Sequence, residues 1–140
     1  MTNHIAPPAT ARTLLRTALG LDAAVSGAMG LVLVLAAGPL AALLRIPEPL
    51  LRYVGLVLFP YAAWVAYVGT RPAVARGQAT AVVAVNAVWA ASSILLLVGA
   101  LVSPTTLGVA FVVLQALVVF AFAEAQWIGL RRVARAGAIA

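Results

Sequence analysis

The 140-residue chain contains no cysteine, no lysine and a single histidine, and only 9% of its residues are charged. Without cysteine the chain has no disulfide, thiol nucleophile or cysteine-ligated cluster. Without lysine it has no Schiff base and no lysine nucleophile. The one histidine, His4, precedes the first apolar run, so a bis-histidine haem or a histidine-based zinc site cannot form within the chain. The sequence therefore predicts no cofactor and no metal ion.

What the chain has in abundance is apolar side chains. Hydrophobic residues make up 65% of the sequence, and the mean hydropathy is +1.13. Soluble domains average about 45 to 50% apolar and about 25% charged residues, so this composition excludes an ordinary soluble domain. A membrane-spanning helix needs about 20 apolar residues, so four spans would use roughly 80 residues and leave about 60 for ends and loops. The length therefore fits one domain of four spans.

Four apolar runs follow one another, separated by short polar or proline-containing stretches. The predicted spans cover residues 12–38, 50–70, 79–102 and 104–130, with an N-terminal tail at 1–11 and a basic tail at 131–140. No run has the alternating pattern of a strand, and the connections are short. The prediction is an all-α fold, a four-transmembrane-helix antiparallel bundle.

Glycine, proline and serine mark the expected ends of these spans. Gly38 and Pro39 are expected to end the first span, and the run LAALLRI that follows is too short to cross, so it should lie flat at the membrane surface. Ser103 is expected to cap the fourth helix, and Pro104 suits its first turn.

The arginines are distributed unevenly between the two ends of the predicted bundle. On the side of both termini lie Arg12, Arg16, Arg71, Arg76, Arg131, Arg132 and Arg135. The other side carries Arg45 and Arg52 beside Glu48. Short cytoplasmic segments collect arginine, so the N-terminus and the C-terminus are both predicted to be cytoplasmic. All basic side chains except His4 are arginine, and alanine and valine are abundant. This composition is typical of a protein from a GC-rich bacterial genome, which suggests the bacterial cytoplasmic (inner) membrane.

The excess of basic over acidic side chains indicates which partners to expect. The net charge is +6, which in a soluble chain would suggest nucleic acid. Here the arginines stand at the edges of apolar runs, so the expected partners are the lipid bilayer and anionic lipids at the cytoplasmic arginines, and no nucleic acid. A homo-oligomer or another membrane protein is a further candidate partner.

Two acids interrupt the predicted spans, Asp22 and Glu124. A carboxylate in hydrocarbon costs several kcal/mol unless it is paired, protonated or hydrated. At 1.5 Å per residue, polar or amphipathic side chains of all four spans lie roughly 9 to 14 Å from the arginine-rich end. These candidates for ligand or cation binding are Asp22, Ser26, Tyr61, Trp64, Asn86, Trp89 and Glu124.

Helical spacing predicts which of these side chains share a face. Asp22 and Ser26 are four residues apart, and Asn86 and Trp89 are three apart, so each pair lies on one side of its helix. On the fourth span, Gln115 and Glu124 are nine residues apart and point to opposite sides. We expect Glu124 to point inward, since a carboxylate loses more than an amide in lipid.

Two interpretations of this polar layer remain open. In the first, Asp22, Asn86 and Glu124, with Arg16 as a further candidate, form a buried hydrogen-bonded clamp that holds the helices in register. In the second, they line a small cavity open to the cytoplasm, with an aromatic wall of Tyr61, Trp64 and Trp89 suited to a cation or a proton.

The chain resembles a group of uncharacterised small bacterial four-helix integral membrane proteins. The segments that carry the resemblance are LAALLRIPEPLLRYVG after Gly38-Pro39, VNAVW in the third span and AEAQWIGLRR at the end. In that group the position of Asn86 is often acidic and the position of Asp22 is often an amide. The resemblance thus implies an exchanged pair in this chain, as expected if the two side chains touch. The group has no established activity.

No catalytic set is present, because a Ser/His/Asp arrangement would need His4. We therefore expect a membrane protein that is not an enzyme and acts as a structural or accessory component or binds a small ligand. The alternative is a small proton-coupled or cation-coupled transporter that acts as a homodimer.

Overall fold

The structure is a computed structural model that describes residues 9–138. Within this range the chain is all helical and contains no strand. The helices are α1 (Ala9–Leu35), α2 (Ala37–Leu44), α3 (Glu48–Thr70), α4 (Arg76–Val98) and α5 (Thr106–Ala138). Four of them, all except α2, are long and apolar enough to cross a membrane. The prediction of an all-helical chain with four candidate spans is therefore confirmed, and these features are those of a multi-pass membrane protein.

The helix ends differ from the predicted ones at both ends of the chain. α1 begins at Ala9, inside the predicted tail, and residues 1–8, which include His4, lie outside the described residues. α5 continues to Ala138, so the predicted basic tail at 131–138 is helical. Arginine, alanine and valine there are compatible with a helix, and no proline interrupts them.

The first span ends earlier than predicted. α1 stops at Leu35, and α2 begins at Ala37, so Gly38 and Pro39 lie in the first turn of α2. A proline in the first turn replaces an amide that has no helical partner, so Pro39 starts a helix here and does not end one. α2 ends at Leu44, and its C-cap residue Arg45 has a positive φ of 54°, which places it in the left-handed region.

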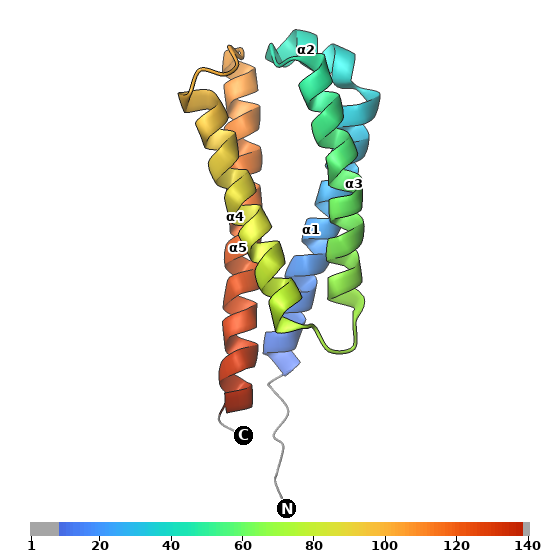
Figure 1. Cartoon of the computed structure of the whole chain (residues 1–140), viewed down its shortest axis with the longest axis vertical. Coiled ribbons are helices and arrows are strands. Elements are labelled where there is room, and N and C mark those ends of the chain that lie inside the picture. The colour runs from blue at the N-terminus through green and yellow to red at the C-terminus, as the bar shows by residue number, and fades with distance from the viewer. Residues whose placement is uncertain (1–8, 139–140) are drawn as a thin grey trace, which may run out of the picture.

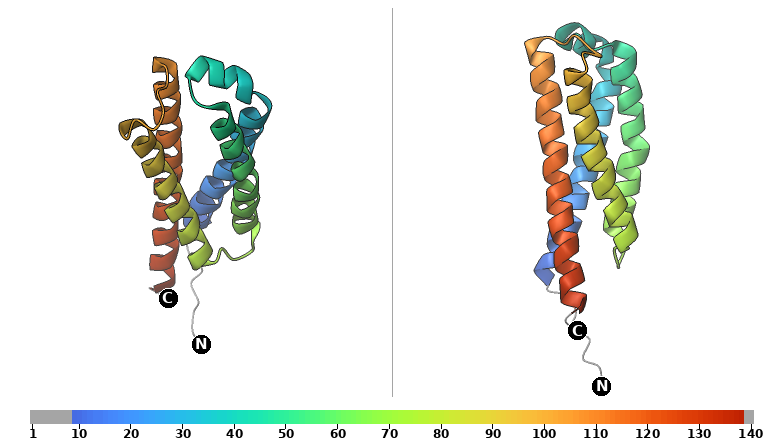
Figure 2. Two further views of the ribbon diagram at one scale, coloured as in Figure 1. Left: turned by 45° about the horizontal axis from the view of Figure 1, so that its top comes forward. Right: turned by 60° about the vertical axis from the view of Figure 1, so that its left-hand side comes forward.

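The long helices form two pairs. α1 packs along α3, and α4 packs along α5, while α1 and α5 join the pairs and α3 hardly touches α4. Figure 1 shows the pairs close together at the end where α1 begins and separated at the end that carries α2. The left view of Figure 2 shows the same separation from another direction. The two pairs thus diverge from the end where α1 begins towards the end that carries α2.

The separated end is tied by the connection between α4 and α5. The Thr105 amide donates to the Leu44 carbonyl at 2.9 Å, and the Thr105 hydroxyl donates to the Leu43 carbonyl at 3.0 Å. The same hydroxyl accepts a hydrogen bond from the Gly108 amide at 3.1 Å. Thr105, and not the predicted Ser103, therefore caps α5, because the cap must also reach the end of α2.

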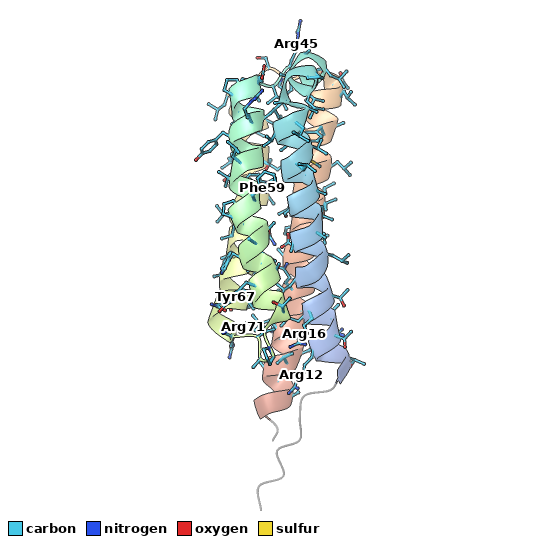
Figure 3. All side chains as sticks on the ribbon, turned by 90° about the vertical axis from the view of Figure 1, so that its right-hand side faces the viewer. Arg12, Arg16, Arg45, Phe59, Tyr67 and Arg71 are labelled. Atoms are coloured by element: carbon cyan, nitrogen blue, oxygen red, sulfur yellow. The ribbon has the colours of Figure 1, made fainter. Side chains whose placement is uncertain are left out.

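The ends of the molecule differ in charge. Figure 3 shows Arg12, Arg16 and Arg71 at the end where α1 begins, and Arg45 at the α2 end. Arg71 lies over the Tyr67 ring, with 4.8 Å between the guanidinium carbon and the ring centroid. Tyrosine and arginine at the ends of an apolar helix are typical of a membrane interface.

The α1–α3 pair depends on two glycines that let the backbones approach. A Cβ atom at Gly55 would lie 2.9 Å from the Gly30 carbonyl oxygen and 2.9 Å from the Leu33 Cβ atom. These distances are shorter than van der Waals contact, so a side chain at Gly55 would push the helices apart.

We predict that Gly55→Ala destabilises the protein by about 1 to 3 kcal/mol, the usual cost of overpacking. The free energy of unfolding in detergent micelles, followed by circular dichroism, measures this. Gly20→Ala is the matched control, because a Cβ atom at Gly20 meets nothing within 4 Å. Equal stabilities of the two variants would contradict the proposed helix contact.

Candidate functional site

A buried carboxylate lies where the four long helices meet. Asp22 of α1 is 0% exposed. Its Oδ1 atom accepts a hydrogen bond from the Ser26 hydroxyl at 3.1 Å. Its Oδ2 atom accepts from Asn86 Nδ2 of α4 at 2.7 Å and from Gln126 Nε2 of α5 at 2.7 Å. We call Asp22, Ser26, Tyr61, Asn86 and Gln126 the Asp22 network.

Tyr61 brings α3 into this network. Its hydroxyl lies 3.0 Å from Asp22 Oδ2 and 2.7 Å from Asn86 Oδ1. A tyrosine has one hydroxyl proton, so it donates to only one of these two oxygens at a time. Tyr61 can therefore donate either to Asp22 or to Asn86.

The Asp22 carboxylate has no cationic partner. Among the described residues the one ion pair joins Arg52 to Glu48 on α3. The arginine of α1 nearest to Asp22 in the sequence, Arg16, donates instead to the carbonyl oxygens of Arg71 and Pro72. No buried side-chain nitrogen or oxygen in the described part of the chain lacks a hydrogen-bond partner. Hydrogen bonds, and not an opposite charge, thus compensate for the removal of this carboxylate from water.

The prediction that Glu124 points inward is wrong. Glu124 is exposed on α5, together with Leu117 and Phe120 of the same face. Gln126 is 0% exposed in its place. Two residues along a helix correspond to a rotation of about 200°, so only one of these positions can face the core. Glu124 lies one turn before Trp127, close enough to the end of the span for its carboxylate to reach the interface.

A sequence signal for Gln126 existed. Gln115 and Gln126 are 11 residues apart, which is about three helical turns, so they share a face. Gln115 also points inward: its Oε1 accepts from Trp89 Nε1 at 3.0 Å, and its Nε2 donates to Ser93 Oγ at 2.7 Å. The face of α5 that carries the two amides turns inward, and the face with Glu124 turns outward. The reason is that both amides form hydrogen bonds with side chains of α4.

The predicted aromatic wall is only partly present. Trp89 bonds to Gln115 and does not reach Asp22. Trp64 packs against the core and meets Tyr61 edge-on, with ring centroids 6.2 Å apart. This contact orients the Tyr61 ring, while Trp64 lines neither of the two cavities beside the network.

Two cavities adjoin the Asp22 network. The smaller, of about 70 Å³, is lined by Ser26, Tyr61, Asn86 and Trp89 together with apolar residues. The larger, of about 380 Å³, extends from Ser26 and Trp89 towards Leu33 and Ile46 near α2. The large cavity thus lies on the side of the network away from Arg12 and Arg16. The second interpretation expects a small cavity lined by Asp22 and Glu124, and neither residue lines either of these two cavities.

The larger cavity is apolar and uncharged. Its polar lining consists of Ser26, Trp89, Ser93 and Gln115, and none of its lining side chains is ionisable. Ser26 belongs to the Asp22 network, whereas Ser93 and Gln115, which bond to each other, lie about two to three helical turns further along α4 and α5. The clamp and a cavity are therefore both present, at neighbouring levels of the bundle.

The chain matches no protein-family model, no curated protein and no solved structure with which it was compared. The interpretation of the site therefore rests on its geometry.

The position of Gln126 gives a direct test. Gln126→Leu keeps the volume but leaves Asn86 and Asp22 each without one partner, so we predict a loss of about 1 to 3 kcal/mol in the free energy of unfolding. Glu124→Leu, two residues away, should change it by less than about 0.5 kcal/mol. Both values come from denaturant titrations in detergent micelles. A larger loss for Glu124→Leu would show that α5 has the opposite rotation.

Proposed function

We propose that this protein is a non-enzymatic membrane protein that binds a small, neutral, mostly apolar molecule within the bilayer. The observation that carries the proposal is the cavity of about 380 Å³ between the two helix pairs. Ligand pockets measure about 300 to 1,000 Å³ and combine an apolar lining with a few polar groups. This cavity has that size and that composition.

The lining indicates the chemistry of the ligand. A charged group would enter an environment with no opposite charge, at a cost of several kcal/mol, so the ligand is neutral. The few polar side chains of the lining, Ser26, Trp89, Ser93 and Gln115, suit one hydrogen-bonding group, such as a hydroxyl or a carbonyl, on an elongated apolar molecule. Since α3 hardly touches α4, the ligand enters sideways from the bilayer.

The Asp22 network acts in this proposal as the clamp that makes the cavity possible. It joins α1, α3, α4 and α5 at one level. Because the helices are held there, the two pairs can separate towards α2 without losing their register. The candidate residues of the polar layer thus support the ligand site, and Ser26 and Trp89 also line it.

The arrangement in the membrane is part of the proposal. We infer an antiparallel bundle with both termini in the cytoplasm of a bacterial cell, in the cytoplasmic (inner) membrane. The arginines at the end where α1 begins support this orientation. The Asp22 network then lies near the cytoplasmic leaflet, and the apolar cavity lies towards the opposite leaflet.

A brominated long-chain alcohol, 9,10-dibromooctadecanol, tests the ligand site through its quenching of tryptophan fluorescence. In a variant whose only tryptophan is Trp89 (Trp64→Phe, Trp127→Phe), we expect saturable quenching in detergent micelles. In a variant that keeps only Trp127, which is 40% exposed, quenching should rise with probe concentration without saturating. Non-saturable quenching of Trp89 would overturn the proposal.

A cavity-filling variant provides the second arm of this experiment. Val119→Phe places a ring in the space that Val119 lines, so the affinity for the probe should fall about tenfold or more. Val109→Phe is the matched control, because Val109 is exposed on α5 and lines no cavity described above. Equal affinities of the two variants would count against the cavity as the binding site.

A second candidate function, proton-coupled transport, is favoured by one observation. Asp22 is fully buried with no cationic partner among the described residues, and the Tyr61 hydroxyl lies 3.0 Å from its Oδ2 atom. Intramembrane acids of this kind mark proton pathways in transporters. This function requires a second copy of the chain, since four spans alone rarely enclose a pathway with two gates.

Proton flux into proteoliposomes that contain the dye pyranine tests this candidate. If the protein conducts protons, Asp22→Asn should abolish the flux, because an amide side chain neither gains nor loses a proton near neutral pH. Glu124→Gln, at the exposed acid on α5, should leave the flux unchanged. Identical flux from Asp22→Asn and from the original chain would exclude Asp22 as a proton carrier.

A further inference from the structure

A second kind of cavity lies at the arginine-rich end of the bundle. Its volume is about 210 Å³, and Arg12 and Arg16 of α1 and Arg76 at the start of α4 line it. We call it the arginine pocket. It lies among α1, the 71–75 connection and the last turns of α5, and it is separate from the apolar cavity beside the Asp22 network.

No acidic side chain among residues 9–138 neutralises the positive charge of this pocket. The chain has three acids. Asp22 is bonded in its network, Glu48 pairs with Arg52 near the opposite end, and Glu124 is exposed on α5 and does not line the pocket. The three arginines that line the pocket are exposed and no carboxylate lines it with them, so an anion that enters meets uncompensated positive charge.

One of the three arginines is held in place by the fold. Arg16 Nη2 donates to the Arg71 carbonyl and to the Pro72 carbonyl, the latter at 2.8 Å. These bonds fix the guanidinium at the pocket while its Nη1 and Nε atoms remain available as donors. A fixed planar fork of donors suits the oxygen atoms of a phosphate group.

The rest of the pocket is apolar. Leu15, Val74, Leu130 and Val133 form this part of its lining. A free phosphate ion would use the arginines and leave this surface bare. A phosphate that carries hydrocarbon would cover both parts at once.

We propose that the arginine pocket binds the phosphate headgroup of an anionic membrane lipid. Arg12, Arg16 and Arg76 donate to the phosphate oxygens, and the first carbons of the lipid lie against Leu130 and Val133. The lipid belongs to the leaflet at this end of the bundle. Its occupancy closes the space between α1, α5 and the connection before α4, so it also stabilises the end that the Asp22 network adjoins.

Native mass spectrometry of the full-length protein tests the lipid site. The probes are dioctanoyl phosphatidylglycerol, which is anionic, and dioctanoyl phosphatidylcholine, which is zwitterionic. We expect one phosphatidylglycerol to bind at least about fivefold more tightly than phosphatidylcholine, given the attraction that each arginine contributes near an anionic headgroup. Equal affinity for the two lipids would overturn the proposal.

Variants separate the pocket from the general positive charge of this end. Arg12→Gln with Arg76→Gln should weaken phosphatidylglycerol binding about tenfold or more. Arg131→Gln with Arg132→Gln removes the same charge from exposed positions of α5 that do not line the pocket, and should change binding little. Equal losses from the two double variants would show a diffuse surface effect and overturn the pocket. If the first double variant unfolds, the single variants Arg12→Gln and Arg76→Gln carry the same comparison against Arg131→Gln.

Inorganic phosphate distinguishes the source of the anion. Phosphate at concentrations equal to those of phosphatidylglycerol should displace little of the lipid, because it cannot cover the apolar lining. Complete displacement at equal concentrations would identify a free phosphate site and overturn the lipid proposal. These measurements do not involve the apolar cavity, so their result is independent of the function proposed above.

Discussion

A carboxylate buried among four apolar helices, without a cation beside it, is the constraint from which the arrangement of this protein follows. Asp22 is fully buried, and removal of a charge from water is costly unless hydrogen-bond donors replace the water. No single helix supplies enough donors. Ser26 comes from the same helix, and Tyr61, Asn86 and Gln126 come from the other three. The hydrogen bonds that the Asp22 carboxylate requires therefore bring all four spans together at one level and set the rotation of each helix about its axis.

The same constraint accounts for the shape of the rest of the bundle. Below the network, towards the arginine-rich end, α1 packs against α5 at Gly129, where a Cβ atom would lie 3.0 Å from Leu15 Cα. Above it, Gly30 and Gly55 hold α1 to α3, but no comparable contact joins α3 to α4. The pairs therefore separate, and the space between them is lined mostly by apolar side chains. Thr105, bonded to the end of α2, limits that separation.

Charge divides the molecule into two chemically different regions. The apolar cavity contains no ionisable side chain, and the arginine pocket contains three arginines and no acid. A neutral molecule suits the first and a phosphate the second, since each would be poorly accommodated in the other. Asp22 lies between the two regions and joins the helices that line both.

The amino-acid sequence by itself determined the membrane class, the number of long helices and the layer that contains Asp22, Tyr61 and Asn86, because composition and spacing act within each helix separately. Tertiary structure alone decided the rotation of α5, the early end of α1 and the place of the cavity. Glu124 and Gln126 are equally compatible with a helix, and the choice between them depends on donors and acceptors that other helices present. Likewise, Pro39 can end one helix or begin the next, and the packing of α2 against α3 and α5 selects the second. A local sequence pattern does not contain the hydrogen bonds and packing contacts that other helices supply, so only the assembled bundle shows these choices.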